Sequence, residues 1–253
     1  MTKTGKRRSE AVAFEFATAG RIVFGSGSIQ KAGVLAAELG RKAFVVTGKN
    51  PGRAAGLFGA LRQSGIAAVT CPVPGEPTTD FVMKSARQAR QAGCDMVIGF
   101  GGGSALDAAK AVSALLGNTG DLMDYLEVVG RGKPLEKPAV PCLAVPTTAG
   151  AGAEVTRNAV LTSPVHKVKA SLRSPLLLPR LVLIDPELTL SLPPEATAAT
   201  GMDALSHALE ALHSTQAQPL ADGLALFAIR EIRDALPRCV AAPGDLVARG
   251  RQL

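Results

Sequence analysis

Hydrophobic and polar positions follow two different patterns along the chain. Up to about residue 185, short apolar runs rich in β-branched residues alternate with stretches of helical periodicity. Strands are predicted at 42–48, 67–73 and 94–100, and helices at 51–63, 79–91 and 104–116. Alternation of this kind is typical of a mostly parallel sheet with helices on its faces. The first part of the chain is therefore predicted to be an α/β domain.

The later part of the chain ends this alternation. Further apolar runs predict more strands, at 139–146, 159–162, 168–172 and 181–185. Helices alone are predicted after them, at 201–214, 217–236 and from 244 onward. We therefore place a boundary near Pro186, between an α/β domain at 1–186 and the start of an all-helical domain at 187–253. The last helix reaches Leu253 without a stop signal, so the helical domain is expected to be incomplete.

Composition and charge restrict the function classes. Hydrophobic residues make up 47% of the 253 residues, enough for a sizeable core, and no apolar run approaches the ~18 residues of a membrane-spanning helix. The net charge of +7 fits either a plain basic surface or a preference for phosphorylated small molecules. Part of it lies in a basic tail at 2–10, and the rest lacks the aromatic interleaving of a nucleic-acid platform. We expect neither nucleic acid nor a membrane as a partner, and the scattered cysteines favour the cytosol.

Three glycines between a strand and a helix form the strongest motif of the first part. In "IGFGGGSALDAAKAVSALL" (98–116), a buried strand leads into Gly101, Gly102 and Gly103 and then into a helix that begins near Ser104. Free backbone amides and the positive end of a helix dipole converge there, which suits a phosphate. Ser104 can cap the helix or donate to a phosphate oxygen. A tight turn that binds nothing is the alternative.

Two further polar clusters of this part could face the same ligand. Asp107 and Lys110 lie one and two turns into the helix. One of them can face the ligand, or the two can form an exposed ion pair. The stretch "VPTTAGAGAEVT" (145–156) leaves a predicted strand, presents Thr147 and Thr148, and continues as a loop rich in glycine and alanine. Hydroxyls and free amides in such a loop suit a ribose or a phosphate, and an ordinary threonine-rich turn explains the residues equally well.

The stretch "TGMDALSHALEALHS" (200–214) carries candidate metal ligands. On a helix, Asp203, His207 and Glu210 share one narrow stripe, with leucines on the opposite side. A carboxylate and an imidazole at i and i+4 can hold one divalent ion, or they can form an exposed pair worth a few tenths of a kcal/mol. His213 is rotated by roughly 80° from Asp203, so it is expected at the surface or the helix end.

Four motifs in this order resemble the iron-containing (group III) alcohol dehydrogenase family: "FGSGS" (24–28), "GGGSALDAAK" (101–110), "PTTAGAGAEVT" (146–156) and "IDPELTLSLPPEATAATGMDALSHALEAL" (184–212). The resemblance spans nearly the whole chain. It implies a dinucleotide-binding domain, a helical domain, and a cleft in which Fe²⁺ or Zn²⁺ polarises an alcohol oxygen. Such an enzyme transfers a hydride between NAD(P) and an alcohol or aldehyde, and a homodimer is expected.

The resemblance also implies roles for single residues. Cofactor contacts are expected from Gly48, Gly101, Gly102, Gly103, Ser104, Asp107, Thr147, Thr148 and Lys169. Within this set, the glycine-rich turn would hold the diphosphate, and Lys169 would reach a ribose. Asp203 and His207 are the expected metal ligands and catalytic residues.

Two departures from the family pattern concern the cofactor and the metal. Many members carry an aspartate after the first core strand, suited to the 2'-hydroxyl of NAD, whereas this chain has Gly48, with Lys49 and Arg53 nearby. Without that carboxylate a 2'-phosphate is not repelled, so we favour NADP, with NAD as second choice. Family members also supply two further histidines later in the chain, and none follows His213 here. We therefore expect cofactor binding with poor metal retention.

Other functions remain open at this point. A non-catalytic nucleotide-binding or oligomerisation module would need no complete metal site. Within the enzyme class, glycerol dehydrogenase-like and maleylacetate reductase-like activities are the alternatives to a general alcohol dehydrogenase.

Overall fold

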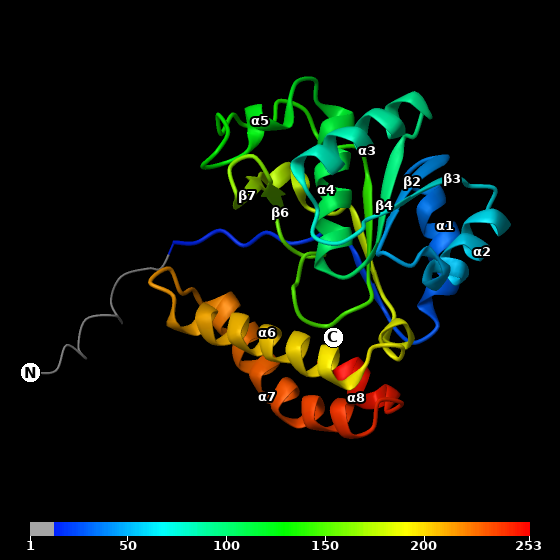
Figure 1. The fold of residues 1–253 in the computed structure, drawn as a ribbon. Coiled ribbons are helices and arrows are strands. Elements are labelled where there is room, and N and C mark those ends of the chain that lie inside the picture. Colours follow the sequence, from blue (N-terminus) through cyan, green and yellow to red (C-terminus); the bar gives the residue numbers. More distant parts are fainter. Residues whose placement is uncertain (1–12) are drawn as a thin grey trace, which may run out of the picture.

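The computed structural model describes residues 13–253, in which an α/β unit carries a layer of helices on one side (Figure 1). The basic tail predicted at 2–10 lies outside the described residues. Within residues 13–253, no helix combines the length and the apolar character needed to cross a membrane.

A six-stranded parallel sheet forms the centre of the α/β unit, in the order β1-β8-β5-β4-β2-β3. The strands are Ile22–Phe24 (β1), Lys42–Thr47 (β2), Ala67–Pro72 (β3), Met96–Gly101 (β4), Cys142–Pro146 (β5) and Leu181–Ile184 (β8). The strand order reverses at β2, because β3 pairs with one of its edges and β4 with the other. In open parallel sheets, such a switch point leaves a crevice outside the carboxyl ends of the strands. The predicted α/β fold with a mostly parallel sheet is confirmed.

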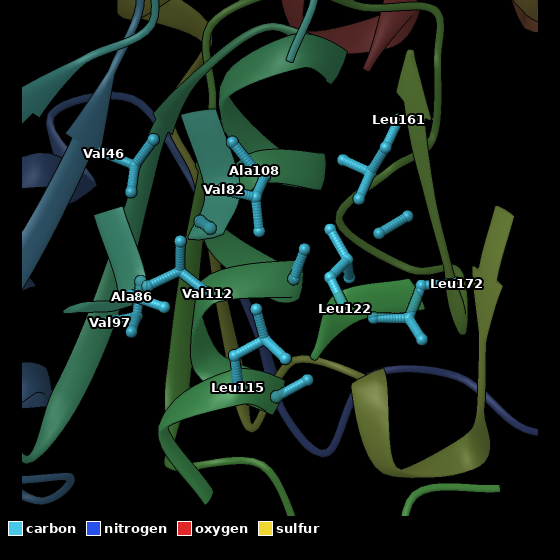
Figure 2. Packing of buried hydrophobic residues seen from close by; sticks show 14 of the residues in the cluster. Val46, Val82, Ala86, Val97, Ala108, Val112, Leu115, Leu122, Leu161 and Leu172 are labelled. Carbon is cyan, nitrogen blue, oxygen red and sulfur yellow. The ribbon is translucent and has the colours of Figure 1, made fainter. Parts of the chain in front are cut away.

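Helices cover both faces of this sheet. The helices are Ala32–Ala37 (α1), Ala55–Gln63 (α2), Thr79–Gln91 (α3) and Gly103–Gly117 (α4), and the short turns are Ser28–Lys31 (η1) and Pro51–Ala54 (η2). Alternate side chains of β2 point to opposite faces of the sheet. Ala43 and Val45 pack with α1 and α2, and Phe44 and Val46 pack with α3 and α4. Figure 2 shows the second of these cores, where apolar side chains of α3 and α4 meet those of the sheet.

Asn158–Ser163 (β6) and Val168–Arg173 (β7) form a separate antiparallel pair, which we call the hairpin (residues 158–173). Both strands were predicted, but they do not join the parallel sheet. The connection at 164–167 is too short for a parallel crossover, which needs a dozen or more residues. Buried Leu161 and Leu172 hold the hairpin in the same core as α4 (Figure 2). The short helix Leu122–Tyr125 (α5) packs there too.

The helical layer follows β8. It contains Pro194–His213 (α6), Pro219–Ala241 (α7) and Leu246–Gln252 (α8). The short turn Pro186–Thr189 (η4) connects β8 to α6, and another, Pro175–Leu177 (η3), precedes β8. Helices were predicted in all three places, and α6 begins before the predicted residue. A Cβ on Gly201 of α6 would lie 2.3 Å from Leu236 Cδ1 of α7, so glycine lets these helices approach closely. The division into domains at 1–186 and 187–253 stays a prediction.

Asp185 joins the first and last segments of the α/β unit. Its side chain is fully buried, and Oδ1 accepts hydrogen bonds from the backbone N–H groups of Gly27 (3.1 Å) and Glu187 (3.0 Å). Oδ2 accepts from the N–H of Ile29 (3.0 Å). Because a buried carboxylate requires such donors, Asp185 holds the turn before η1 against the end of β8, where the chain leaves for α6.

Replacing Asp185 by alanine should destabilise the protein strongly. Three backbone donors would lose their acceptor, so we expect the free energy of unfolding to fall by about 3 kcal/mol in urea titrations followed by circular dichroism. Asp80→Ala is the control, because Asp80 is exposed in the first turn of α3 and its loss should cost less than about 1 kcal/mol. Equal losses in the two variants would contradict the role of Asp185.

Candidate cofactor and metal site

Three loops meet at the carboxyl ends of β2, β4 and β5. Gly48 follows β2, and its N–H donates to the carbonyl of Phe100 at 3.2 Å. Thr147 follows β5, and its N–H donates to the carbonyl of Gly101 at 2.9 Å. These bonds extend the strand pairing by one step. The glycine-rich turn (residues 101–104) therefore lies between its two neighbours at the switch point of the sheet.

Glycine is required in this turn for two physical reasons. Gly101 has a φ of +152°, which side-chain-bearing residues rarely adopt, and a Cβ there would lie 2.8 Å from the Cβ of Ala105. A Cβ on Gly102 would meet the side chain of Thr148 at 3.3 Å. The missing side chains let the threonine loop (residues 147–152) lie against the turn. The turn itself carries no side chain that covers its first two backbone amides.

The start of α4 differs from the prediction. The helix begins at Gly103 with Gly102 as its N-cap, so Ser104 lies in the first turn and does not cap the helix. Its hydroxyl donates instead to Glu76 Oε1 at 3.1 Å. The first N–H groups of a helix have no partner within it, and the helix dipole is positive there. The turn can therefore bind an anion such as a diphosphate.

Glu76 is a site residue that the sequence analysis missed. Its carboxylate accepts one hydrogen bond from Ser104 and another from Lys169 Nζ, at 2.8 Å. The hydrogen bond from Lys169 is the main reason that the pKa of Glu76 lies below its usual value. Glu76 thus bridges the glycine-rich turn and the hairpin. A single glutamate in a proline-containing loop forms no pattern that could have revealed this contact.

The remaining predicted cofactor residues lie at the same edge in different surroundings. Thr147 is buried, whereas Thr148 is partly exposed. The two oxygens of Asp107 are engaged within the protein, one with Lys110 Nζ and one with the N–H of Val160, both at 3.1 Å. Burial raises the pKa of Asp107, and the charge of Lys110 opposes this rise. Direct contacts between these residues and a cofactor stay predictions.

Gly150 brings the candidate metal ligands next to the threonine loop. A Cβ on Gly150 would lie 2.5 Å from the carbonyl oxygen of Thr200, so the loop backbone touches α6 directly. Asp203 follows Thr200 by three residues, about one helical turn. Its Oδ1 lies 3.7 Å from Nε2 of His207, and both side chains are about half exposed. Neither Gly150 nor Thr200 was singled out from the sequence, because their contact joins distant segments.

Asp203 and His207 fit the part of a divalent-metal site that one helix can supply. Carboxylate oxygen and imidazole nitrogen are ordinary ligands of zinc and iron, and catalytic zinc sites use three protein ligands. In the part of the chain that the structure describes, no group of three or more His, Cys, Asp and Glu side chains could hold a metal ion. The pair therefore supplies two ligands, and its role in metal binding stays a prediction.

Comparisons with known proteins agree with this architecture. Residues 19–186 match the family model for iron-containing alcohol dehydrogenase, and residues 197–253 match the model for the C-terminal part of Fe-containing alcohol dehydrogenases. The probable alcohol dehydrogenase EutG of Escherichia coli (strain K12) is 39% identical over 234 residues, which cover 90% of this chain and 58% of EutG. Long-chain-alcohol dehydrogenase 1 of Geobacillus thermodenitrificans (strain NG80-2) is 44% identical over 190 residues, which cover 75% of this chain and 47% of that protein.

A solved structure shows the same fold. The crystal structure of a 1,3-propanediol oxidoreductase superposes with a TM-score of 0.90 at 35% identity, covering 95% of this chain and 63% of that chain. The chain spans about half the length of these two curated relatives, 58% of EutG and 47% of long-chain-alcohol dehydrogenase 1. Because the two family models account for most of its residues, the chain belongs to the iron-containing alcohol dehydrogenase family.

Proposed function

We propose that the protein is an NADP-preferring, metal-dependent oxidoreductase that transfers a hydride between the cofactor and a small alcohol or aldehyde. The observation that carries the proposal is that the threonine loop lies against the glycine-rich turn at Gly102 and against α6 at Thr200, three residues before Asp203. When bound, a divalent iron or zinc ion would supply Lewis-acid polarisation of the substrate oxygen, and the nicotinamide would supply hydride transfer.

The glycine-rich turn and the hairpin would hold the cofactor from two sides. The first amides of α4 and the hydroxyl of Ser104 suit the diphosphate, and the cation of Lys169 suits a ribose or phosphate oxygen. Glu76 now accepts hydrogen bonds from both of these side chains. Cofactor binding would therefore exchange the carboxylate of Glu76 for cofactor oxygens at Ser104 and Lys169.

The end of β2 favours NADP over NAD. A Cβ on Gly48 would meet no atom within 4 Å, so open space lies beside this residue. Lys49 follows it and is exposed. If the adenosine ribose lies here, its 2'-phosphate has room and a nearby positive charge. The residue that follows β2 carries no carboxylate to repel that phosphate.

Asp203 and His207 would hold the metal from α6, beside the cofactor. Their spacing of four residues directs both side chains to one face of the helix, where they lie 3.7 Å apart. The contact between Gly150 and Thr200 sets the distance of this face from the threonine loop. Hydride transfer needs the substrate carbon close to the nicotinamide, and this docking would fix that proximity.

Gly48→Asp should shift the cofactor preference. An aspartate would repel the 2'-phosphate of NADPH and accept hydrogen bonds from the ribose of NADH, and the open space around Gly48 admits it without a clash. We expect the affinity for NADPH to fall roughly tenfold or more, while that for NADH rises. Titrations that follow nicotinamide fluorescence measure both affinities.

Gly223→Asp is the matched control for this experiment. Gly223 lies in α7, and a Cβ there also meets no atom within 4 Å. This variant should keep the ratio of NADPH to NADH affinity. If Gly48→Asp left the ratio unchanged as well, the assignment of NADP through this position would be wrong.

The 253-residue chain should hold Zn²⁺ weakly, through Asp203 and His207. Two half-exposed ligands are fewer than the three of a catalytic site. In equilibrium dialysis, we expect the bound Zn²⁺ to dissociate readily from the chain. We also expect the chain to oxidise alcohols only slowly. His207→Ala should remove this Zn²⁺ binding and leave NADPH binding unchanged.

His213→Ala provides the control for the metal experiment, because His213 is exposed at the end of the same helix. It should bind Zn²⁺ as the unmodified chain does. Equal Zn²⁺ binding by the His207→Ala and His213→Ala variants would overturn the proposed ligands. Tightly bound stoichiometric metal with normal turnover would overturn the expectation of weak retention.

A further inference from the structure

We infer that Asp107 and Lys110 are positioning residues that hold the hairpin, and with it Lys169, at the distance from the glycine-rich turn that cofactor binding needs. The inference rests on the proposed function. It assigns the two residues to the support of the cofactor site and not to direct contact with the cofactor.

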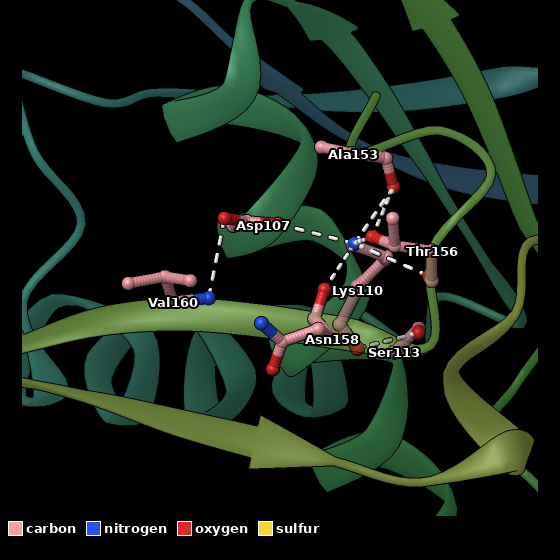
Figure 3. A network of polar contacts seen from close by, with 7 residues as sticks. All are labelled: Asp107, Lys110, Ser113, Ala153, Thr156, Asn158 and Val160. Atoms are coloured by element: carbon pink, nitrogen blue, oxygen red, sulfur yellow. Dashed lines mark hydrogen bonds and ion pairs between the residues drawn. The ribbon is translucent and has the colours of Figure 1, made fainter. Parts of the chain in front are cut away.

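Lys110 is the centre of a buried polar network (Figure 3). Its side chain is 1% exposed, and Nζ donates to the carbonyl of Ala153 at 2.7 Å and to Oγ1 of Thr156 at 3.1 Å. Nζ also donates to the carbonyl of Asn158, the first residue of β6, and forms an ion pair with Asp107 Oδ1 at 3.1 Å. The ammonium group thus meets acceptors on every side, as a buried charge requires.

Asp107 extends this network into the hairpin. Its Oδ2 accepts a hydrogen bond from the N–H of Val160 in β6 at 3.1 Å, and its side chain is 15% exposed. Together, Asp107 and Lys110 bind two residues at the start of β6, Asn158 and Val160. Asp107 and Lys110 belong to α4, which begins within the glycine-rich turn, at Gly103. The network therefore joins the helix that would bind the diphosphate to the strand pair that carries Lys169.

The hairpin needs such an attachment to hold Lys169 in one place. It is outside the main sheet, and a lone pair of strands becomes stable only by packing against other elements, here through Leu161 and Leu172 in the core beside α4. Near its turn, Thr162 pairs with Lys169 in the strand register, and the N–H of Thr162 donates to the carbonyl of Pro77 at 2.9 Å. The ion pair between Lys169 and Glu76 is about 60% exposed on each side and contributes little. Backbone hydrogen bonds also reach the hairpin, from Thr162 to Pro77 and from Glu127 to Ser171. The contacts of Asp107 and Lys110 are the buried side-chain attachment that joins the hairpin to α4.

Lys110→Met tests the attachment, because methionine fills a similar volume and donates no hydrogen bond. We expect NADPH affinity to fall by about tenfold or more, with faster backbone hydrogen exchange in residues 158–173. Asp107→Asn keeps the shape and one acceptor oxygen, so it should weaken NADPH binding less. This milder variant also covers the case in which Lys110→Met does not fold. All titrations are made well below the thermal unfolding transition of each variant.

A double variant separates positioning from general destabilisation. If Lys110 acts through Lys169, then Lys110→Met combined with Lys169→Met should bind NADPH no more weakly than Lys169→Met alone. Lys169→Met by itself should weaken NADPH binding without faster exchange at 158–163. Additive losses in the double variant would overturn the inference.

Leu61→Ala is the stability control. Leu61 is fully buried in the core on the opposite face of the sheet, so its truncation should lower stability by a few kcal/mol and leave NADPH affinity unchanged.

Wild-type NADPH affinity in folded Lys110→Met would overturn the positioning role. If the unmodified chain binds neither NADPH nor NADH, the proposed function fails instead, and the two failures are thereby distinguished.

Discussion

Close approach of backbone segments at the carboxyl edge of the main sheet is the constraint on which the rest of the structure depends. Gly102 lets the threonine loop lie against the glycine-rich turn, and Gly150 lets the same loop touch α6 at Thr200. A side chain on Gly150 would overlap the backbone of Thr200, and one on Gly102 would press against the side chain of Thr148. Close-packed interiors yield little to such changes. The candidate cofactor and metal parts of the site are therefore joined through glycines.

Charged groups around this edge fall into two classes that follow from burial. Lys110 and Asp107 lie inside the protein and are surrounded by partners from α4, from the segment after the threonine loop and from β6. Glu76 and Lys169 pair in contact with solvent. A buried charge is costly without its partners, whereas an exposed pair can open at little cost. The buried pair is thus suited to the framework, and the exposed pair to a contact that a ligand replaces.

Local patterns predicted the elements of this fold because their causes are local. The helix at 79–91 was predicted with its observed bounds, since Thr78 provides a cap and the apolar residues follow the helical period. The spacing of Asp203 and His207 places both on one face of any helix. Ser104 was misjudged as a possible cap because a run of three glycines leaves the first helical residue undetermined to within one position.

The sequence by itself determined the α/β class, the glycine-rich turn, the shared face of Asp203 and His207, and most of the strands and helices. The short elements β1, α1 and α5 were not predicted. Hydrophobic periodicity, glycine content and residue spacing are local features, so they specify structure within one element. Only the tertiary structure decided that β6 and β7 leave the parallel sheet, that Glu76 bridges Ser104 and Lys169, and that Gly150 meets Thr200. The burial of Lys110 belongs to the same group. Each of these features joins residues far apart in the chain, and the free energy of such contacts depends on packing and desolvation, which exist only once the segments have come together.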